Sequence, residues 1–138
     1  MNVWLALASV GHIHHTTALE WFEESPASRL HFCRVTQQAL LRLLTNARVM
    51  GTNVLPASDA WALYDNLCAD ARAVFLPEPP ALEELWRHTS LKQGASANFW
   101  TDAYLAAFAE AAHLTLVTFD QGLARRHGSR VRLLNPVR

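Results

Sequence analysis

The chain has 138 residues, of which 51% are hydrophobic and 17% charged, and this balance excludes an intrinsically disordered protein. Twelve basic and twelve acidic residues give a formal net charge of zero, which argues against non-specific binding of polyanions and leaves a local basic surface open. No apolar run reaches the ~18 residues that a membrane helix needs, and the N-terminal stretch lacks the features of a secretion signal. Cys33 and Cys68 are too few for a disulfide scaffold, so we expect reduced thiols in a cytoplasmic protein with one domain over residues 1–138.

The predicted elements alternate between helices and short apolar strands. In chain order they are a helix at 15–24, a strand at 29–35, a helix from Thr36 to about 47, a helix from 56 or 58 to 68, a strand at 73–76, a short helix within 77–88, a helix at 98–112, and strands at 114–119 and 131–135. This alternation predicts an α/β fold with a parallel sheet flanked by helices.

Two aspartates flank the helix and strand whose patterns are the clearest. Asp102 lies at the beginning of the helix at 98–112, and Asp120 follows the strand LTLVTF. The helix from Asp102 onward is about 16 Å long at 1.5 Å per residue. The strand returns about the same distance at 3.3 Å per residue, so both carboxylates are expected at one edge of the sheet. Carboxylates brought together there repel each other unless a cation lies between them, and Mg²⁺ or Mn²⁺ suits such oxygen ligands.

Spacing alone leaves a simpler interpretation open for each aspartate. Asp102 could be a first-turn residue that interacts favourably with the dipole of its helix. Asp120, which precedes Gln121 and Gly122, could be an ordinary turn residue.

Three segments resemble PIN-domain ribonucleases of the VapC toxin type, in the order in which that family has them. NFWTDAYLAAFAEAAHLTLVTFDQGL is similar to the C-terminal half of the family, where W-x-D-A opens a helix and L-V-T-x-D ends a strand. NVWLALASVGHIHHTTALEWFEE resembles the family's beginning, and RVTQQALLRLLTN resembles a helix of its middle part. The resemblance implies a PIN-like α/β/α domain.

The same resemblance implies an activity, a cofactor and partners. It implies a divalent-metal endoribonuclease, dependent on Mg²⁺ or Mn²⁺, that is the toxin of a toxin–antitoxin pair, with RNA as substrate, an antitoxin as partner and a homodimer as assembly. Asp102 and Asp120 match two acidic metal-site positions of the family. Asn2 matches the asparagine that positions the family's first aspartate, and Thr118 matches the polar residue two positions before the last one.

The chain departs from the family pattern at two places. The first aspartate of the family, and the N-terminal strand that carries it, would precede Met1, so we expect that strand to be missing from this chain. The second departure is the glutamate that many PIN domains carry in the helix after Thr36, because residues 25–58 contain no acid. Gln37 or Gln38 could replace it, and the alternative is that both are ordinary helix-surface residues.

Further candidates are the residues that could contact RNA. Arg125 and Arg126 follow Asp120, Arg42 could add to the same rim, and Trp100 could stack on a base; a solvated loop and core packing are the alternatives. His12, His14 and His15 are more consistent with packing and capping than with zinc, because no second ligand cluster completes a site. Two other functions stay open, a catalytically incomplete PIN-type module that binds RNA or protein, and a receiver-like regulatory domain.

Overall fold

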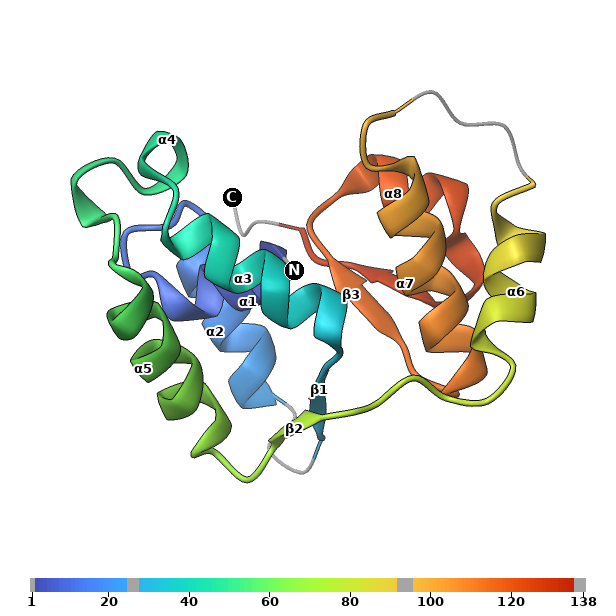
Figure 1. The fold of residues 1–138 in the computed structure, drawn as a ribbon, viewed down its shortest axis with the longest axis horizontal. Coiled ribbons are helices and arrows are strands. Elements are labelled where there is room, and N and C mark those ends of the chain that lie inside the picture. The colour runs from blue at the N-terminus through green and yellow to red at the C-terminus, as the bar shows by residue number, and fades with distance from the viewer. Residues whose placement is uncertain (1, 25–27, 92–95, 136–138) are drawn as a thin grey trace. The chain divides into compact units, whose positions relative to one another are not determined.

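The computed structural model describes residues 2–24, 28–91 and 96–135, which fold into two compact units (Figure 1). The N-terminal unit comprises the described residues up to Leu76, and the C-terminal unit comprises those from Pro77 to Asn135. Within the described residues, no helix combines the length and the apolar character that crossing a membrane requires.

The N-terminal unit is mainly helical around one pair of parallel strands. Its elements in chain order are α1 (Asn2–Ala8), α2 (His15–Glu24), β1 (Leu30–Phe32), α3 (Arg34–Leu44), α4 (Ala47–Met50), the 3-10 turn η1 (Gly51–Asn53), α5 (Ala57–Cys68) and β2 (Ala73–Phe75). The strands pair in parallel, with Leu30 opposite Ala73 and Phe32 opposite Phe75.

An aromatic cluster forms the core of this unit. Phe32 is fully buried, its ring stacks on Trp4 at a centroid distance of 3.7 Å, and Tyr64 meets it edge-on at 5.0 Å. Leu40 and Leu44 of α3 are fully buried in the same cluster, one helical turn apart. Burial of these large side chains from α1, β1, α3 and α5 therefore fixes how the elements of this unit pack.

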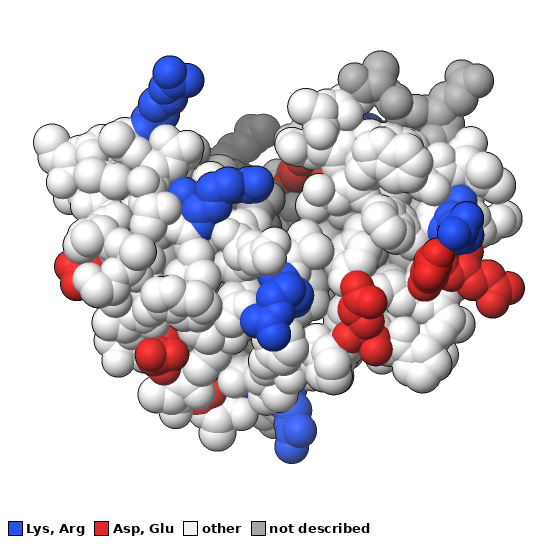
Figure 2. All heavy atoms as spheres, viewed as in Figure 1, with Lys and Arg blue, Asp and Glu red and all other residues white. Residues whose placement is uncertain are grey.

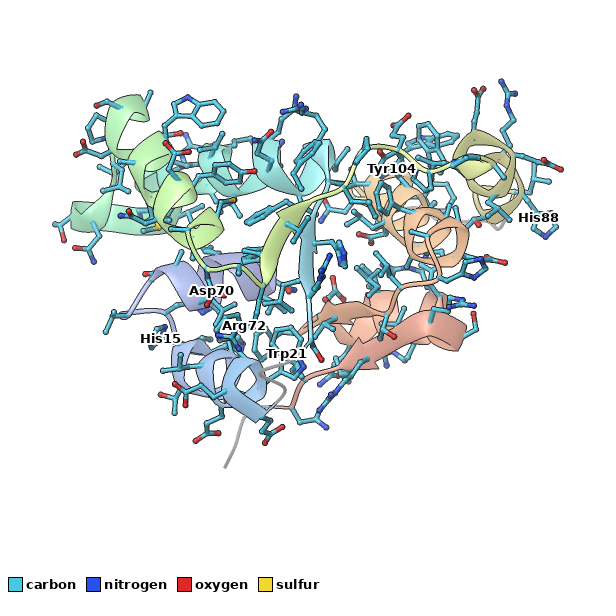
Figure 3. The ribbon with its side chains drawn as sticks, turned by 90° about the horizontal axis from the view of Figure 1, so that it is seen from below. His15, Trp21, Asp70, Arg72, His88 and Tyr104 are labelled. Carbon is cyan, nitrogen blue, oxygen red and sulfur yellow. The ribbon has the colours of Figure 1, made fainter. Side chains whose placement is uncertain are left out.

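Arg72, just before β2, connects that strand to α2 (Figure 3). Its guanidinium donates to both carboxylate oxygens of Asp70 and to the backbone carbonyl of Phe22 at 3.1 Å. The guanidinium also lies 3.6 Å from the centroid of the Phe22 ring. One half-buried cation thus satisfies the end of α2, where backbone carbonyls have no partner within the helix.

The C-terminal unit repeats the combination of helices with a parallel strand pair. Its elements are α6 (Leu82–Thr89), α7 (Phe99–Ala111), β3 (Leu116–Thr118), α8 (Gln121–Arg126), the 3-10 turn η2 (Gly128–Arg130) and β4 (Val131–Leu133). Leu116 pairs with Val131 and Thr118 with Leu133. α6 packs along α7, and the Tyr104 hydroxyl donates to Glu78 at 2.8 Å.

The predicted α/β class with parallel strands is confirmed, whereas several boundaries are wrong. The predicted strand at 29–35 is shorter, because the Thr36 hydroxyl accepts the N–H of Cys33 and α3 already begins at Arg34. The helix predicted within 77–88 begins only at Leu82, after Ala81 adopts a left-handed backbone conformation (φ 67°). The described strands form two separate parallel pairs, one in each unit, where a single sheet was expected.

We expect Arg72→Met to lower the free energy of unfolding by about 1–2 kcal/mol at pH 7, because it removes the contacts with the Phe22 carbonyl and ring. Hydrogen bonds from Arg72 hold the pKa of Asp70 below its usual 3.8, so the contribution of that pair is complete above pH 3.8 and is lost as the pH falls further. Urea unfolding at pH 7 and at pH 3 measures both effects. Arg48→Met, at an exposed arginine of α4, is the matched control. An equal loss in both variants would contradict the assigned role.

Candidate metal and RNA site

Asp102 is a buried carboxylate in the first turn of α7. The alanine-rich sequence of this segment contains no helix breaker, and the N-terminal end of a helix favours a negative charge. Burial raises the pKa of Asp102 above its ordinary value, and a hydrogen bond from the Arg126 guanidinium opposes that rise. The carboxylate therefore occupies an environment that favours a nearby cation.

Asp120 is held at the junction of β3 and α8. Its Oδ1 accepts the N–H of Leu123 at 3.0 Å, so Asp120 is the N-cap of α8. The hydroxyl oxygen of buried Thr118 accepts the N–H of Asp120 at 3.0 Å. Backbone and side-chain hydrogen bonds thus fix the direction of the second carboxylate.

Arg126, in the last turn of α8, forms an ion pair with the carboxylate of Asp102. Its Nη2 lies 2.8 Å from Oδ2 of Asp102. A Cβ atom at Gly122, one turn earlier, would lie 3.0 Å from Nη1 of Arg126 and 3.1 Å from Oδ1 of Asp120. The tip of the Arg126 side chain and the Asp120 carboxylate therefore both lie close to Gly122, where a side chain would crowd them.

We call Asp102, Thr118, Asp120, Gly122 and Arg126 the acidic corner. Asp120 also raises the pKa of Asp102 by charge repulsion, as is expected of neighbouring carboxylates. The structure thus brings the two aspartates together at the start of α7 and the end of β3, as the equal lengths of helix and strand predict.

The donor set of the acidic corner fits a small divalent cation. Mg²⁺ is commonly held by one or two carboxylates and completes its shell with water and phosphate oxygens. Across residues 2–24, 28–91 and 96–135, no group of three or more His, Cys, Asp or Glu side chains forms a metal-binding cluster. Two carboxylates are therefore what the described residues offer, and their role as ligands stays a prediction.

Comparison with known proteins assigns the chain to a family. The family model of the PIN domain matches residues 1–128. The chain belongs to the PIN domain family. It is 44% identical to Ribonuclease VapC41 of Mycobacterium tuberculosis, over 96% of this chain and 94% of the relative. It is also 29% identical to Ribonuclease VapC29 of that organism, over 92% and 87% of the two chains, and 30% identical to Ribonuclease VapC38, over 89% and 84%.

Two further residues predicted for the site of this PIN domain lie in the N-terminal unit. Asn2 is half-buried and begins α1, and Arg42 is exposed near the end of α3. Their roles stay predictions.

The two glutamines of α3 differ sharply in this PIN domain. Gln38 is exposed, whereas Gln37 is buried, so the interpretation of both as surface residues is wrong for Gln37. The Gln37 amide oxygen accepts a hydrogen bond from Arg34, and its side chain also bonds Tyr64. Burial raises the pKa of Tyr64 to about 12, so that hydroxyl stays protonated at neutral pH. Gln37 is engaged with partners within its own unit.

Trp100 lies on a different face of α7 from Asp102, because a separation of two residues turns a helix by about 200°. Its side chain is 63% exposed, and its carbonyl accepts the indole N–H of Trp86 at 3.1 Å. The two indole rings meet edge-on at 6.2 Å. Arg125 is exposed in the last turn of α8.

The histidines of the turn between α1 and α2 pack and cap as their spacing predicts. The N–H of His14 donates to Nδ1 of His12 at 3.1 Å, and Nδ1 of His15 lies 2.7 Å from the carbonyl of Ala6. These contacts hold the two helices of the PIN domain together at their connection.

The sequence interpretation missed the pair between Arg126 and Asp102, since the arginine was assigned only to RNA contact or a solvated loop. A signal was present, because Asp120 is a good N-cap and Gly122 and Arg126 are spaced one helical turn apart. A helix predicted to begin at the N-cap Asp120 would have placed Arg126 one turn after Gly122, on the side of the helix near the two aspartates.

We expect Asp120→Ala to cost about 1 kcal/mol of stability, because it removes the N-cap of α8, whereas Asp120→Asn keeps that cap and costs only a few tenths. Both substitutions remove the negative charge and are expected to weaken binding of Mn²⁺. Thermal unfolding and calorimetric titration with Mn²⁺ measure the two properties separately. Unchanged Mn²⁺ binding in both variants would show that Asp120 is only a cap.

Proposed function

We propose that this chain is a metal-dependent endoribonuclease, the toxin of a type II toxin–antitoxin pair, and that residues 1–138 act as one PIN-like domain. One observation carries the proposal: Asp102 and Asp120 come together at the acidic corner of a chain that is 44% identical to Ribonuclease VapC41. A carboxylate pair of this kind is suited to phosphodiester chemistry when a divalent cation joins it.

Asp102 and Asp120 would hold Mg²⁺ or Mn²⁺. When bound, such a cation supplies an activated water and neutralises the charge that develops on the phosphate. The Thr118 hydroxyl accepts a hydrogen bond from the backbone N–H of Asp120 and so orients the residue that carries the second carboxylate. Asn2 is assigned the positioning of a further aspartate on the resemblance alone.

Contacts to RNA are assigned to individual arginines. On the face drawn in Figure 2, the Lys and Arg side chains of the described residues are scattered among uncharged surface instead of forming one basic stripe. Arg125 and Arg126 lie in the last turn of α8, at the acidic corner or next to it, and a guanidinium fork matches a phosphate group. Arg42 and Trp100 are weaker candidates, for a phosphate and a base respectively.

An antitoxin and a second copy of the chain are the proposed protein partners. Val10 and Ile13, in the turn between α1 and α2, are 83% and 87% exposed, and Leu91 after α6 is 80% exposed. Single exposed apolar side chains are common on protein surfaces, so both partners are proposed on the resemblance to VapC toxins. The mass of the purified chain by light scattering tests the homodimer.

We expect the chain to cleave RNA in the presence of Mn²⁺, and Asp102→Asn and Asp120→Asn to abolish cleavage while the far-UV circular dichroism stays unchanged. The reason is that each substitution removes one negative ligand. Asp65→Asn, at an exposed aspartate of α5, is the control and should cleave normally. A fluorogenic RNA assay with and without EDTA measures the activity.

The alternative, a catalytically incomplete binding module, makes the opposite prediction. The small number of carboxylates at the acidic corner is the observation that favours it. RNA binding without cleavage, together with no heat of Mn²⁺ binding, would establish the module and overturn the nuclease.

A further inference from the structure

We propose that Arg126 is an internal cation of the acidic corner that a divalent metal ion must displace, and that the displaced guanidinium then binds an RNA phosphate. This inference rests on the proposed function, because it concerns how the same site is loaded. It assigns to Arg126 two alternative partners, Asp102 without metal and the substrate with metal.

The first support is the place of the guanidinium. Nη2 bonds Oδ2 of Asp102 at 2.8 Å, while Nη1 and the Oδ1 of Asp120 lie 3.0 Å and 3.1 Å from the position that a Cβ atom on Gly122 would take. The guanidinium therefore occupies a position on Oδ2 of Asp102 for which a metal ion bound by that carboxylate would compete. Gly122 leaves room beside the guanidinium, because a Cβ atom there would lie 3.0 Å from Nη1 and would require a small shift of the arginine.

The second support is charge balance. Two carboxylates carry a charge of −2, which a divalent cation neutralises completely and one guanidinium neutralises by half. Arginine and metal together would leave a surplus positive charge in a partly buried place, and the two cations would repel each other. Binding of the metal ion therefore favours departure of the arginine.

The third support is the difference in exposure between the partners. The Arg126 side chain is 38% exposed, whereas the Asp102 side chain is only 9% exposed and belongs to the buried face of α7. The arginine can rotate into water at the end of α8, and the aspartate cannot follow it. A freed guanidinium at this place remains near the site, where its planar fork suits a phosphate of the substrate.

The first test is calorimetric titration of the full chain with Mn²⁺ in the absence of RNA. Arg126→Met keeps the apolar stem and removes the competing cation, so we expect Mn²⁺ to bind about three- to tenfold more tightly. Arg125→Met removes the same charge from the neighbouring exposed position and should change the affinity less than twofold. Arg126→Lys keeps a charge without the fork and should lie between the wild type and Arg126→Met.

The second test is thermal unfolding with EDTA and with saturating Mn²⁺. In EDTA, Arg126→Met leaves the Asp102 carboxylate without its cation, so its Tm should fall below that of the wild type. With saturating Mn²⁺ the difference should vanish, because the metal ion then neutralises Asp102 in both proteins. A merely structural role would lower the Tm equally under both conditions and would overturn the inference.

The third test addresses the phosphate. At saturating Mn²⁺, Arg126→Met should raise the KM for RNA more than it lowers kcat, and should make KM less sensitive to salt. Weaker Mn²⁺ binding by Arg126→Met, or equal tightening by Arg125→Met, would overturn the competition with metal. An unchanged KM and salt dependence would overturn the contact with phosphate.

These outcomes separate the inference from the proposed function. If Mn²⁺ binds more tightly to Arg126→Met but no RNA is cleaved by any variant, the nuclease proposal and the assigned phosphate contact fail while the competition stands. If neither the wild type nor Arg126→Met binds Mn²⁺, the competition is overturned whether or not RNA is cleaved.

Discussion

An ion pair between the buried carboxylate of Asp102 and the half-exposed guanidinium of Arg126 constrains the packing of the C-terminal unit. α7 buries most of its residues, nearly all of them apolar, and Asp102 is the charged side chain among them. An ionised carboxylate in such a place is costly unless a cation compensates it, and Arg126 supplies that cation from another helix. The position of α8 beside the first turn of α7 is therefore set by charge as well as by packing.

A short connection at the end of β3 makes this pair possible. β3 ends at Thr118 and Asp120 caps α8, so only Phe119 and Asp120 separate the strand from the helix. With only six residues in α8, Gly122 and Arg126 share one face, one turn apart. The hydrogen bonds that stabilise this turn also orient the carboxylate, which means that stability and the proposed chemistry draw on the same side chains.

The N-terminal unit is stabilised by an aromatic and aliphatic core, and its buried polar side chain Gln37 lies beside that core. Its aromatic core around Phe32 needs no charge, and the apolar stripe of α3 predicts that burial correctly. Gln37 lies next to that stripe and is buried through bonds with Arg34 and Tyr64, residues from its own helix and from α5. The helical period of α3 places Gln37 on the face of Leu40 and Leu44, three and seven residues further on, and places exposed Gln38 off that face. The local pattern therefore indicates which amide is buried, whereas its partner Tyr64 on α5 is decided by the tertiary structure.

The sequence by itself determined the alternation of helices with parallel strands, the PIN resemblance, and the meeting of Asp102 with Asp120, because these follow from periodicity, motif order and the lengths of α7 and β3. The tertiary structure alone decided that Arg126 lies against Asp102, 24 residues away in the chain, and that the strands form one pair in each unit. The physical reason is the distance along the chain over which each interaction acts. Helix and strand periods are local properties, whereas the partner of a buried charge depends on which distant segment packs beside it.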